Sequence, residues 1–144
     1  MSAIEGAQQF VVFRLGGEEY ALPIAQIQEV IRYTRPRSVA SSDAWVIGVI
    51  SLRGKIVPVV DLAGRLGVSA TSDEESKIVI VETADQTVGM IVDAVDEVIS
   101  IEEDQLDTGT IVDREIVSGI AKVDDRLVVT LDARSPLITQ PAAA

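Results

Sequence analysis

The chain has 144 residues, 47% hydrophobic and only 3% aromatic, with a formal net charge of −11 and neither histidine nor cysteine. That composition excludes disulfides, thiolate chemistry and the usual zinc ligands, and the acidic balance argues against nucleic acid, which is bound by clustered Lys and Arg. No apolar run approaches the ~20 residues that span a bilayer, and no signal peptide is visible, so we expect a cytoplasmic protein without membrane insertion.

Short strands with tight turns fill the first half of the chain. Apolar runs bounded by turn residues predict strands over 10–15, 19–22, 46–51 and 55–60, the first two joined by a Gly16-Gly17 hairpin turn. Residues 24–31 suit either a short helical turn or a strand. Because Pro58 has no backbone N–H, its strand is predicted at a sheet edge or bulge. "DLAGRLGV" (61–68) predicts a helical turn ended by glycine.

The second half repeats this plan. Strands are expected near 77–83, 86–92, 95–101, 115–122 and 126–131, with an acidic connection over 102–113. Residues 10–33 lie over 78–101 without a gap, and "GVISLRGKIVPVVDLA" (48–63) lies over "GIAKVDDRLVVTLDA" (119–133). Two long gapless matches in the same order indicate an internal duplication.

Many short strands at close spacing favour a mainly β fold of two small barrels. At about 60 residues each, the copies are marginal alone, so they should pack around a shared core. The expected organisation is a flexible N-terminus over 1–8, a first barrel over 9–71, a polar linker over 72–76, a second barrel over 77–135 and a tail over 136–144.

Motifs for catalysis are scarce. No phosphate-binding glycine loop is present, no cofactor or metal site is indicated, and the carboxylate runs read as solvated surface. Asp107-Thr108-Gly109 has the form of an aspartic protease site, but that chemistry needs two such carboxylates. The matching region near residues 36–39 has no aspartate, so a homodimeric hydrolase is the remote alternative. Arg32, Arg35 and Arg37 form the one basic concentration, either a contact patch or a solvated loop.

Three stretches together resemble the CheW family of bacterial chemotaxis coupling proteins: "QFVVFRLGGEEYALPIAQIQEVI", "VIGVISLRGKIVPVVDL" and "VGMIVDAVDEVISI". The resemblance runs from about Gln9 to Leu137. In this chain Ser51 stands where the family's turn commonly has asparagine, followed by Leu52-Arg53-Gly54.

The resemblance implies two SH3-like five-stranded barrels, with the N-terminal strand able to cross into the second. It implies a non-catalytic adaptor, monomeric alone, that couples the cytoplasmic hairpin tips of chemoreceptors to the regulatory domain of the histidine kinase CheA in membrane-associated arrays. The same fold serving a pilus-motility pathway is the alternative. Kinase contact is expected at exposed apolar residues of the barrel ends, which the sequence does not fix.

A receptor-binding groove between the barrels is also implied, with the helix-in-groove mode of recognition. For the apolar side chains of this set, inter-barrel core is an equal alternative. The positions that match the family are Ile27, Glu29, Gly48, Arg53, Val92, Val95 and Val98.

Arg53 is the member that the duplication singles out. The second copy has Asp124-Asp125 where the first has Arg53-Gly54, so the fold does not require arginine at this turn. A planar guanidinium suits a bidentate contact to a carboxylate. We therefore interpret Arg53 as a partner contact or a source of groove charge, with a solvated turn as the alternative.

Overall fold

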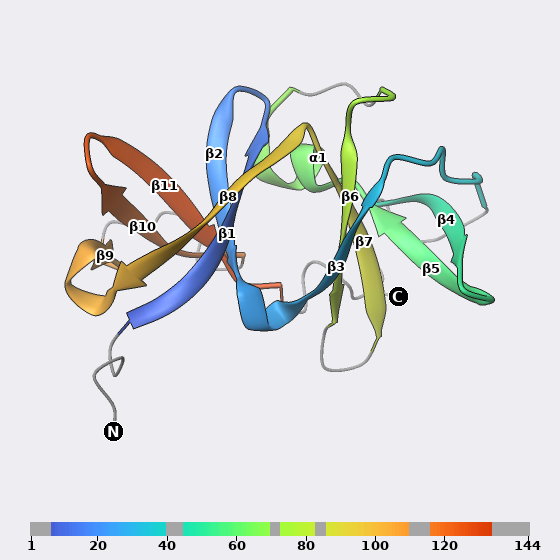
Figure 1. Ribbon diagram of the computed structural model, residues 1–144. Helices are drawn as coiled ribbons and strands as arrows, with labels where there is room; N and C mark the ends of the chain where they lie inside the picture. Colours follow the sequence, from blue (N-terminus) through green and yellow to red (C-terminus); the bar gives the residue numbers. More distant parts are fainter. Residues whose placement is uncertain (1–6, 40–44, 70–72, 83–85, 110–115, 134–144) are drawn as a thin grey trace.

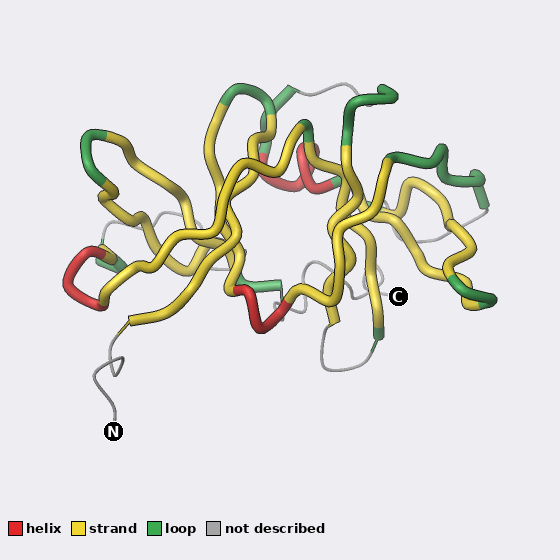
Figure 2. The backbone as a smooth tube through the Cα atoms, viewed as in Figure 1, coloured by secondary structure: helices red, strands yellow, loops and turns green. Residues whose placement is uncertain are grey.

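The computed structural model describes residues 7–39, 45–69, 73–82, 86–109 and 116–133. Its strands form two sheets that lie side by side (Figures 1 and 2). The six-stranded sheet has the order β8 (Ala94–Glu102), β1 (Ala7–Leu15), β2 (Glu18–Pro23), β11 (Arg126–Leu131), β10 (Val117–Val123) and β9 (Leu106–Asp107). The five-stranded sheet has the order β3 (Ile27–Arg32), β6 (Lys77–Glu82), β7 (Thr87–Val92), β5 (Lys55–Val60) and β4 (Val46–Leu52).

The mainly β prediction is confirmed, and every predicted strand is present within a few residues. The ambiguous stretch 24–31 resolves into a 3-10 turn, η1 (Ile24–Gln26), followed by β3. The predicted helical turn is α1 (Leu62–Leu66): the Asp61 carboxylate accepts the Gly64 N–H at 3.0 Å, and Gly67 ends the helix at φ 75°. The acidic connection contains a second 3-10 turn, η2 (Glu103–Gln105).

The two halves of the chain exchange hairpins. β1 and β2 from the first half pair with β8 and β11 of the second, while β6 and β7 from the second half pair with β3 and β5 of the first. The sheets therefore do not coincide with the sequence divisions 9–71 and 77–135, which allowed only the N-terminal strand to cross. Hydrophobic alternation sets which face of a strand is buried, but it does not choose the neighbouring strand.

Three apolar clusters hold this arrangement. A shared core lies between the sheets and includes Phe13, Leu22, Val81, Met90 and Leu131, all at most 1% exposed. Each sheet also encloses a smaller core on its own side. The smaller cores use the same repeat positions, since Phe10, Val12, Ala121 and Val128 match Ile78, Ile80, Ile50 and Val57. The duplication inferred from the sequence is thus visible in the packing.

Closed five-stranded barrels are not what the strand pairings form. Among the described residues, no pairing joins the first and last strands of either sheet, and one sheet has six strands. The sixth strand, β9, has a one-residue counterpart in the other sheet: Arg37 bridges Val49, just as Asp107 pairs with Ile120. The pseudo-symmetry therefore extends to the sheet margins.

Pro58 is not on an edge strand, because β5 lies between β4 and β7. However, β5 pairs with β7 only at Val59 and Val60. The two strands diverge before that point, so the missing N–H of Pro58 costs no ladder hydrogen bond to β7. The edge prediction is therefore wrong, whereas its alternative agrees with a bulge in the β4–β5 pairing between Val46 and Gly48, next to the partner of Pro58.

We expect Gly48→Ala to destabilise the fold by about 1–3 kcal/mol, the range for overpacking. A Cβ at Gly48 would overlap the carbonyl oxygen of Arg37, and this backbone is held by hydrogen bonds of 2.8 and 2.9 Å to Val49. At the matching Gly119, the nearest atom to an added Cβ is the flexible Leu106 side chain at 2.7 Å. Urea unfolding of both variants should therefore show the smaller loss for Gly119→Ala, and equal losses would contradict this account of Gly48.

Candidate partner-binding surface

Arg53 lies at the tip of the β4–β5 turn in a left-handed backbone conformation, with φ 52°. The matching Asp124 has φ 54°, so both copies hold a non-glycine residue in this unusual state. The turn geometry is a shared property of the repeat, whereas the side chain that it presents differs in sign of charge.

The Arg53 guanidinium binds the Glu29 carboxylate of β3 through two parallel contacts. Arg53 Nη2 donates to Glu29 Oε1 at 2.7 Å, and Nη1 donates to Oε2. The Arg53 side chain is 71% exposed, so we expect this ion pair to add little to folding stability. Its effect is to fix the guanidinium over the edge of the five-stranded sheet, with part of its donor surface still facing solvent.

The same pair shifts two ionisation equilibria. The hydrogen bonds from Arg53 lower the pKa of the Glu29 carboxyl below its usual value, and those bonds raise the pKa of Arg53. Because the folded-state pKa of Glu29 is depressed, any stabilisation from the pair is present above the unfolded-state pKa and is lost as pH falls through the folded-state value. At neutral pH both groups are charged.

The second copy contains a related ion pair with different connections. Arg126 donates through Nη2 to Glu97, the repeat counterpart of Glu29, and through Nη1 to Glu19 at 3.1 Å. Arg126 matches Lys55 rather than Arg53. The two matching glutamates on edge strands are therefore bound by arginines at different positions of the two matching hairpins. The hydrogen bond to Glu97 raises the pKa of Arg126.

The remaining predicted groove residues fall into distinct environments. Ile27 and Val95 are half-buried against the shared core, and Val98 is 52% exposed on β8, the edge strand of the other sheet. Val92 is fully buried in the shared core, the alternative that the sequence left open, so it has no surface to offer a partner. Gly48 is buried where the backbone of Arg37 crosses it. The structure brings Glu29 and Arg53 into contact; Val98 is on the other sheet.

The two most exposed of the large apolar residues described were not singled out from the sequence. Ile56 is 75% exposed and Leu127 is 66% exposed, and they occupy matching positions at the starts of β5 and β11. Each belongs to a nearly continuous apolar run, in which the sequence does not distinguish the outward-facing side chain from the buried ones. Aligning the two copies would have flagged them, since each follows the basic residue that closes its hairpin.

A groove of about 390 Å³ adjoins Arg53, where β5 and β7 diverge. Its walls combine aliphatic and polar side chains. Among the described lining residues, Glu82 alone carries a carboxylate. The lining residues are Gln28, Leu52, Arg53, Lys55, Ile56, Val57, Pro58, Glu82, Gln86 and Thr87.

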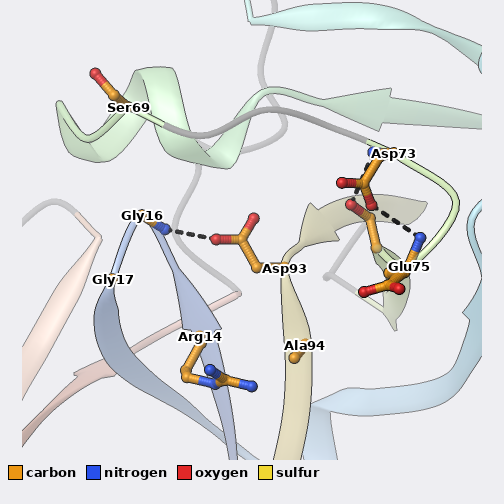
Figure 3. Close-up of a pocket in the computed structure, with 9 residues that line it drawn as sticks. Arg14, Gly16, Gly17, Ser69, Asp73, Glu75, Asp93 and Ala94 are labelled. Atoms are coloured by element: carbon orange, nitrogen blue, oxygen red, sulfur yellow. Dashed lines mark hydrogen bonds between the residues drawn. The ribbon is translucent and has the colours of Figure 1, made fainter.

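A second hollow, of about 530 Å³, lies between the β1–β2 turn, the start of β8 and the segment before β6 (Figure 3). Two of its lining carboxylates accept backbone hydrogen bonds: Asp93 accepts the Gly16 N–H at 2.9 Å, and Asp73 accepts the Glu75 N–H at 2.8 Å. Within the described ranges, no group of three or more acidic side chains is placed to hold a metal ion. This hollow therefore offers fixed structure and no recognisable chemistry.

The Asp107 motif forms a local turn. Its carboxylate accepts the Gly109 N–H at 2.8 Å on an exposed segment. The repeat counterpart, fixed by the pairing to β10 and β4, is Arg37. One chain thus supplies a single carboxylate at this position, and its symmetry mate is a cation.

Taken together, the fold and surface define a duplicated β-sheet binding module with charged, partly apolar faces at its margins. The chain belongs to the family of CheW-like domains, whose model matches residues 9–138. None of the helices described is long and apolar enough to cross a membrane.

Named relatives agree with this assignment. The chain is 31% identical over 139 residues to the chemotaxis protein CheW of Bacillus subtilis, covering 93% of this chain and 89% of that protein. It is 33% identical over 84 residues to the protein PilI of Pseudomonas aeruginosa, covering 58% and 47%. The solved structure of the scaffolding protein TtCheW from Thermoanaerobacter tengcongensis superposes with a TM-score of 0.83 at 36% identity, covering 92% of each chain.

Proposed function

We propose that this chain is a non-catalytic adaptor that couples chemoreceptor cytoplasmic tips to the regulatory domain of the histidine kinase CheA and scaffolds their array. The observation that carries the proposal is the match of the CheW-like model over residues 9–138, nearly the whole chain. Proteins named for chemotaxis and for scaffolding share this fold at about a third identity. In this role the protein is cytoplasmic, monomeric alone, and recruited to receptor arrays at the membrane.

The proposed receptor surface is centred on the Glu29–Arg53 pair. The guanidinium is held in place by Glu29 yet remains largely exposed, which preorganises it for a carboxylate or carbonyl of a helical hairpin. Ile27 and Val95, which pack against the shared core, would contribute apolar contacts to the receptor together with Val98. Gly48 would act indirectly, by allowing the backbone of Arg37 to pack closely against β4. We assign Leu127, exposed at the end of the second half, as a candidate kinase contact.

A pilus-motility pathway is the second candidate setting. The relative PilI fits this setting, and its match covers 58% of this chain. The two settings require the same adaptor fold and differ in the partners that are bound.

Calorimetric titration against a CheA regulatory domain and a receptor cytoplasmic fragment from the same organism tests the proposal. We expect binding to both, with a ternary complex in pull-downs. Binding only to pilus-system partners would favour the second setting, and binding to neither set would remove the adaptor function.

A further inference from the structure

Four cations of this acidic protein lie where β3 ends and β6 begins, and along the segment that leads from β3 to the outer edge of β4. Arg32 ends β3, Lys77 begins β6, and Arg35 and Arg37 follow on the segment that leads toward β4. We call these four residues the basic margin. Arg32, Arg35 and Arg37 are exposed, and within the described chain none of the four side chains forms an ion pair.

Arg32 and Lys77 lie directly opposite each other in the antiparallel β3–β6 ladder. Like charges at such positions repel, since directly opposed side chains are close neighbours on one face. The corresponding pair in the six-stranded sheet is Gln9 of β1 opposite Ser100 of β8, and both residues are uncharged. The same ladder is thus built elsewhere in this protein without the repulsion, so the fold does not need the two cations.

The segment after β3 is fixed in position. Arg37 N–H donates to the Val49 carbonyl at 2.8 Å, and Val49 N–H donates to the Arg37 carbonyl at 2.9 Å. The corresponding stretch of the second copy carries the opposite charge, with exposed Glu102, Glu103 and Asp104, and Asp107 at the position of Arg37. An apolar rim accompanies the arginines, because Val39 and Ile47 are 42% and 41% exposed beside the Arg37–Val49 bridge.

We propose that the basic margin is a docking surface for an acidic protein segment that carries aliphatic side chains beside its carboxylates. Carboxylates of the partner would relieve the Arg32–Lys77 repulsion and pair with Arg35 and Arg37, while Val39 and Ile47 receive the aliphatic groups. The net charge of −11 on the whole chain disfavours a polyphosphate backbone as the occupant. The inference rests on the proposed adaptor function for its partners, but it names a surface separate from the Arg53 turn.

The duplication supplies the test variant. Arg32→Ser with Lys77→Gln installs the side chains that the β1–β8 ladder has at the matching positions, Ser100 and Gln9. We expect this double variant to unfold at the same or a higher urea concentration, because it removes a repulsion. We expect its binding to the kinase regulatory domain or the receptor fragment to be about tenfold weaker at low salt, with a flatter salt dependence.

The control is Arg14→Gln with Lys122→Gln, which makes the same change in net charge on the six-stranded sheet. If the ladder variant binds both partners as the control does, the basic margin is not a docking surface. Loss of binding in Arg53→Ala alone would then leave the adaptor function in place and overturn only this inference. Failure of the unmodified protein to bind either partner would overturn both.

Discussion

Phe13→Ala should lower the free energy of unfolding by about 3–5 kcal/mol, the usual cost of deleting a large buried aromatic ring. Phe13 is fully buried in the shared core, and its ring stacks on Tyr20 with centroids 6.1 Å apart. The side chain belongs to β1, yet it fills space between both sheets. Removing it therefore weakens the contact on which the two halves depend together.

Urea unfolding followed by circular dichroism measures this loss, and Trp45 gives an independent fluorescence signal from the other sheet. Leu127→Ala is the control, because its exposed side chain should change stability by less than about 0.5 kcal/mol. Since a domain of this size has only about 5–15 kcal/mol of stability, Phe13→Leu provides a milder change if the alanine variant does not fold. A loss below about 1 kcal/mol for Phe13→Ala, with an unchanged denaturant slope, would show that the shared core does not unite the sheets.

Arg53→Ala should weaken partner binding by about 2 kcal/mol, roughly 30-fold, while leaving stability nearly unchanged. The guanidinium is held in place by Glu29 and its side chain is 71% exposed, so it can contribute to the free energy of partner binding but contributes little to folding stability. Alanine is preferred to glycine because glycine would also relax the left-handed backbone at φ 52°. Calorimetric titration of the receptor fragment is the direct measurement.

Two further variants test whether the charge of Arg53 and its positioning by Glu29 cause the expected loss of binding. Arg53→Asp copies the residue that the second repeat holds at φ 54°, so it should fold and bind more weakly than Arg53→Ala. Glu29→Ala added to Arg53→Ala should cost nothing more if Glu29 acts by positioning the arginine. If a folded Arg53→Ala protein binds as tightly as the unmodified protein, Arg53 is a solvated turn residue and not a partner contact.

The local elements of this fold could be read from the sequence because their signals are local. Gly16-Gly17, the cap at Asp61 and the stop at Gly67 each act within a few residues, and the predicted boundaries followed them. The duplication was also readable, since matching apolar positions form matching cores. The exchange of hairpins was not, because strand partners are chosen by tertiary packing.

The candidate site divides in the same way. Arg53 was found by comparing the two copies, but its bidentate partner Glu29 lies 24 residues away and is brought near only by the fold. Val92 was named for the groove and proved to be core, since an apolar residue in an apolar strand has the same sequence signal in both settings. The repulsion between Arg32 and Lys77 became visible only with the ladder register.

The exchange of hairpins has a consequence for biosynthesis. β1 and β2 leave the ribosome well before the strands beside them, β8 and β11, which come from the second copy of the repeat. An isolated hairpin is at best marginally stable in water, so Phe10, Val12 and Phe13 stay exposed until β8 and β11 have been made. Folding must then join distant segments at once, which is slow and exposes the nascent chain to aggregation. Neither half is a self-sufficient unit, and the two copies are inherited, made and folded as one.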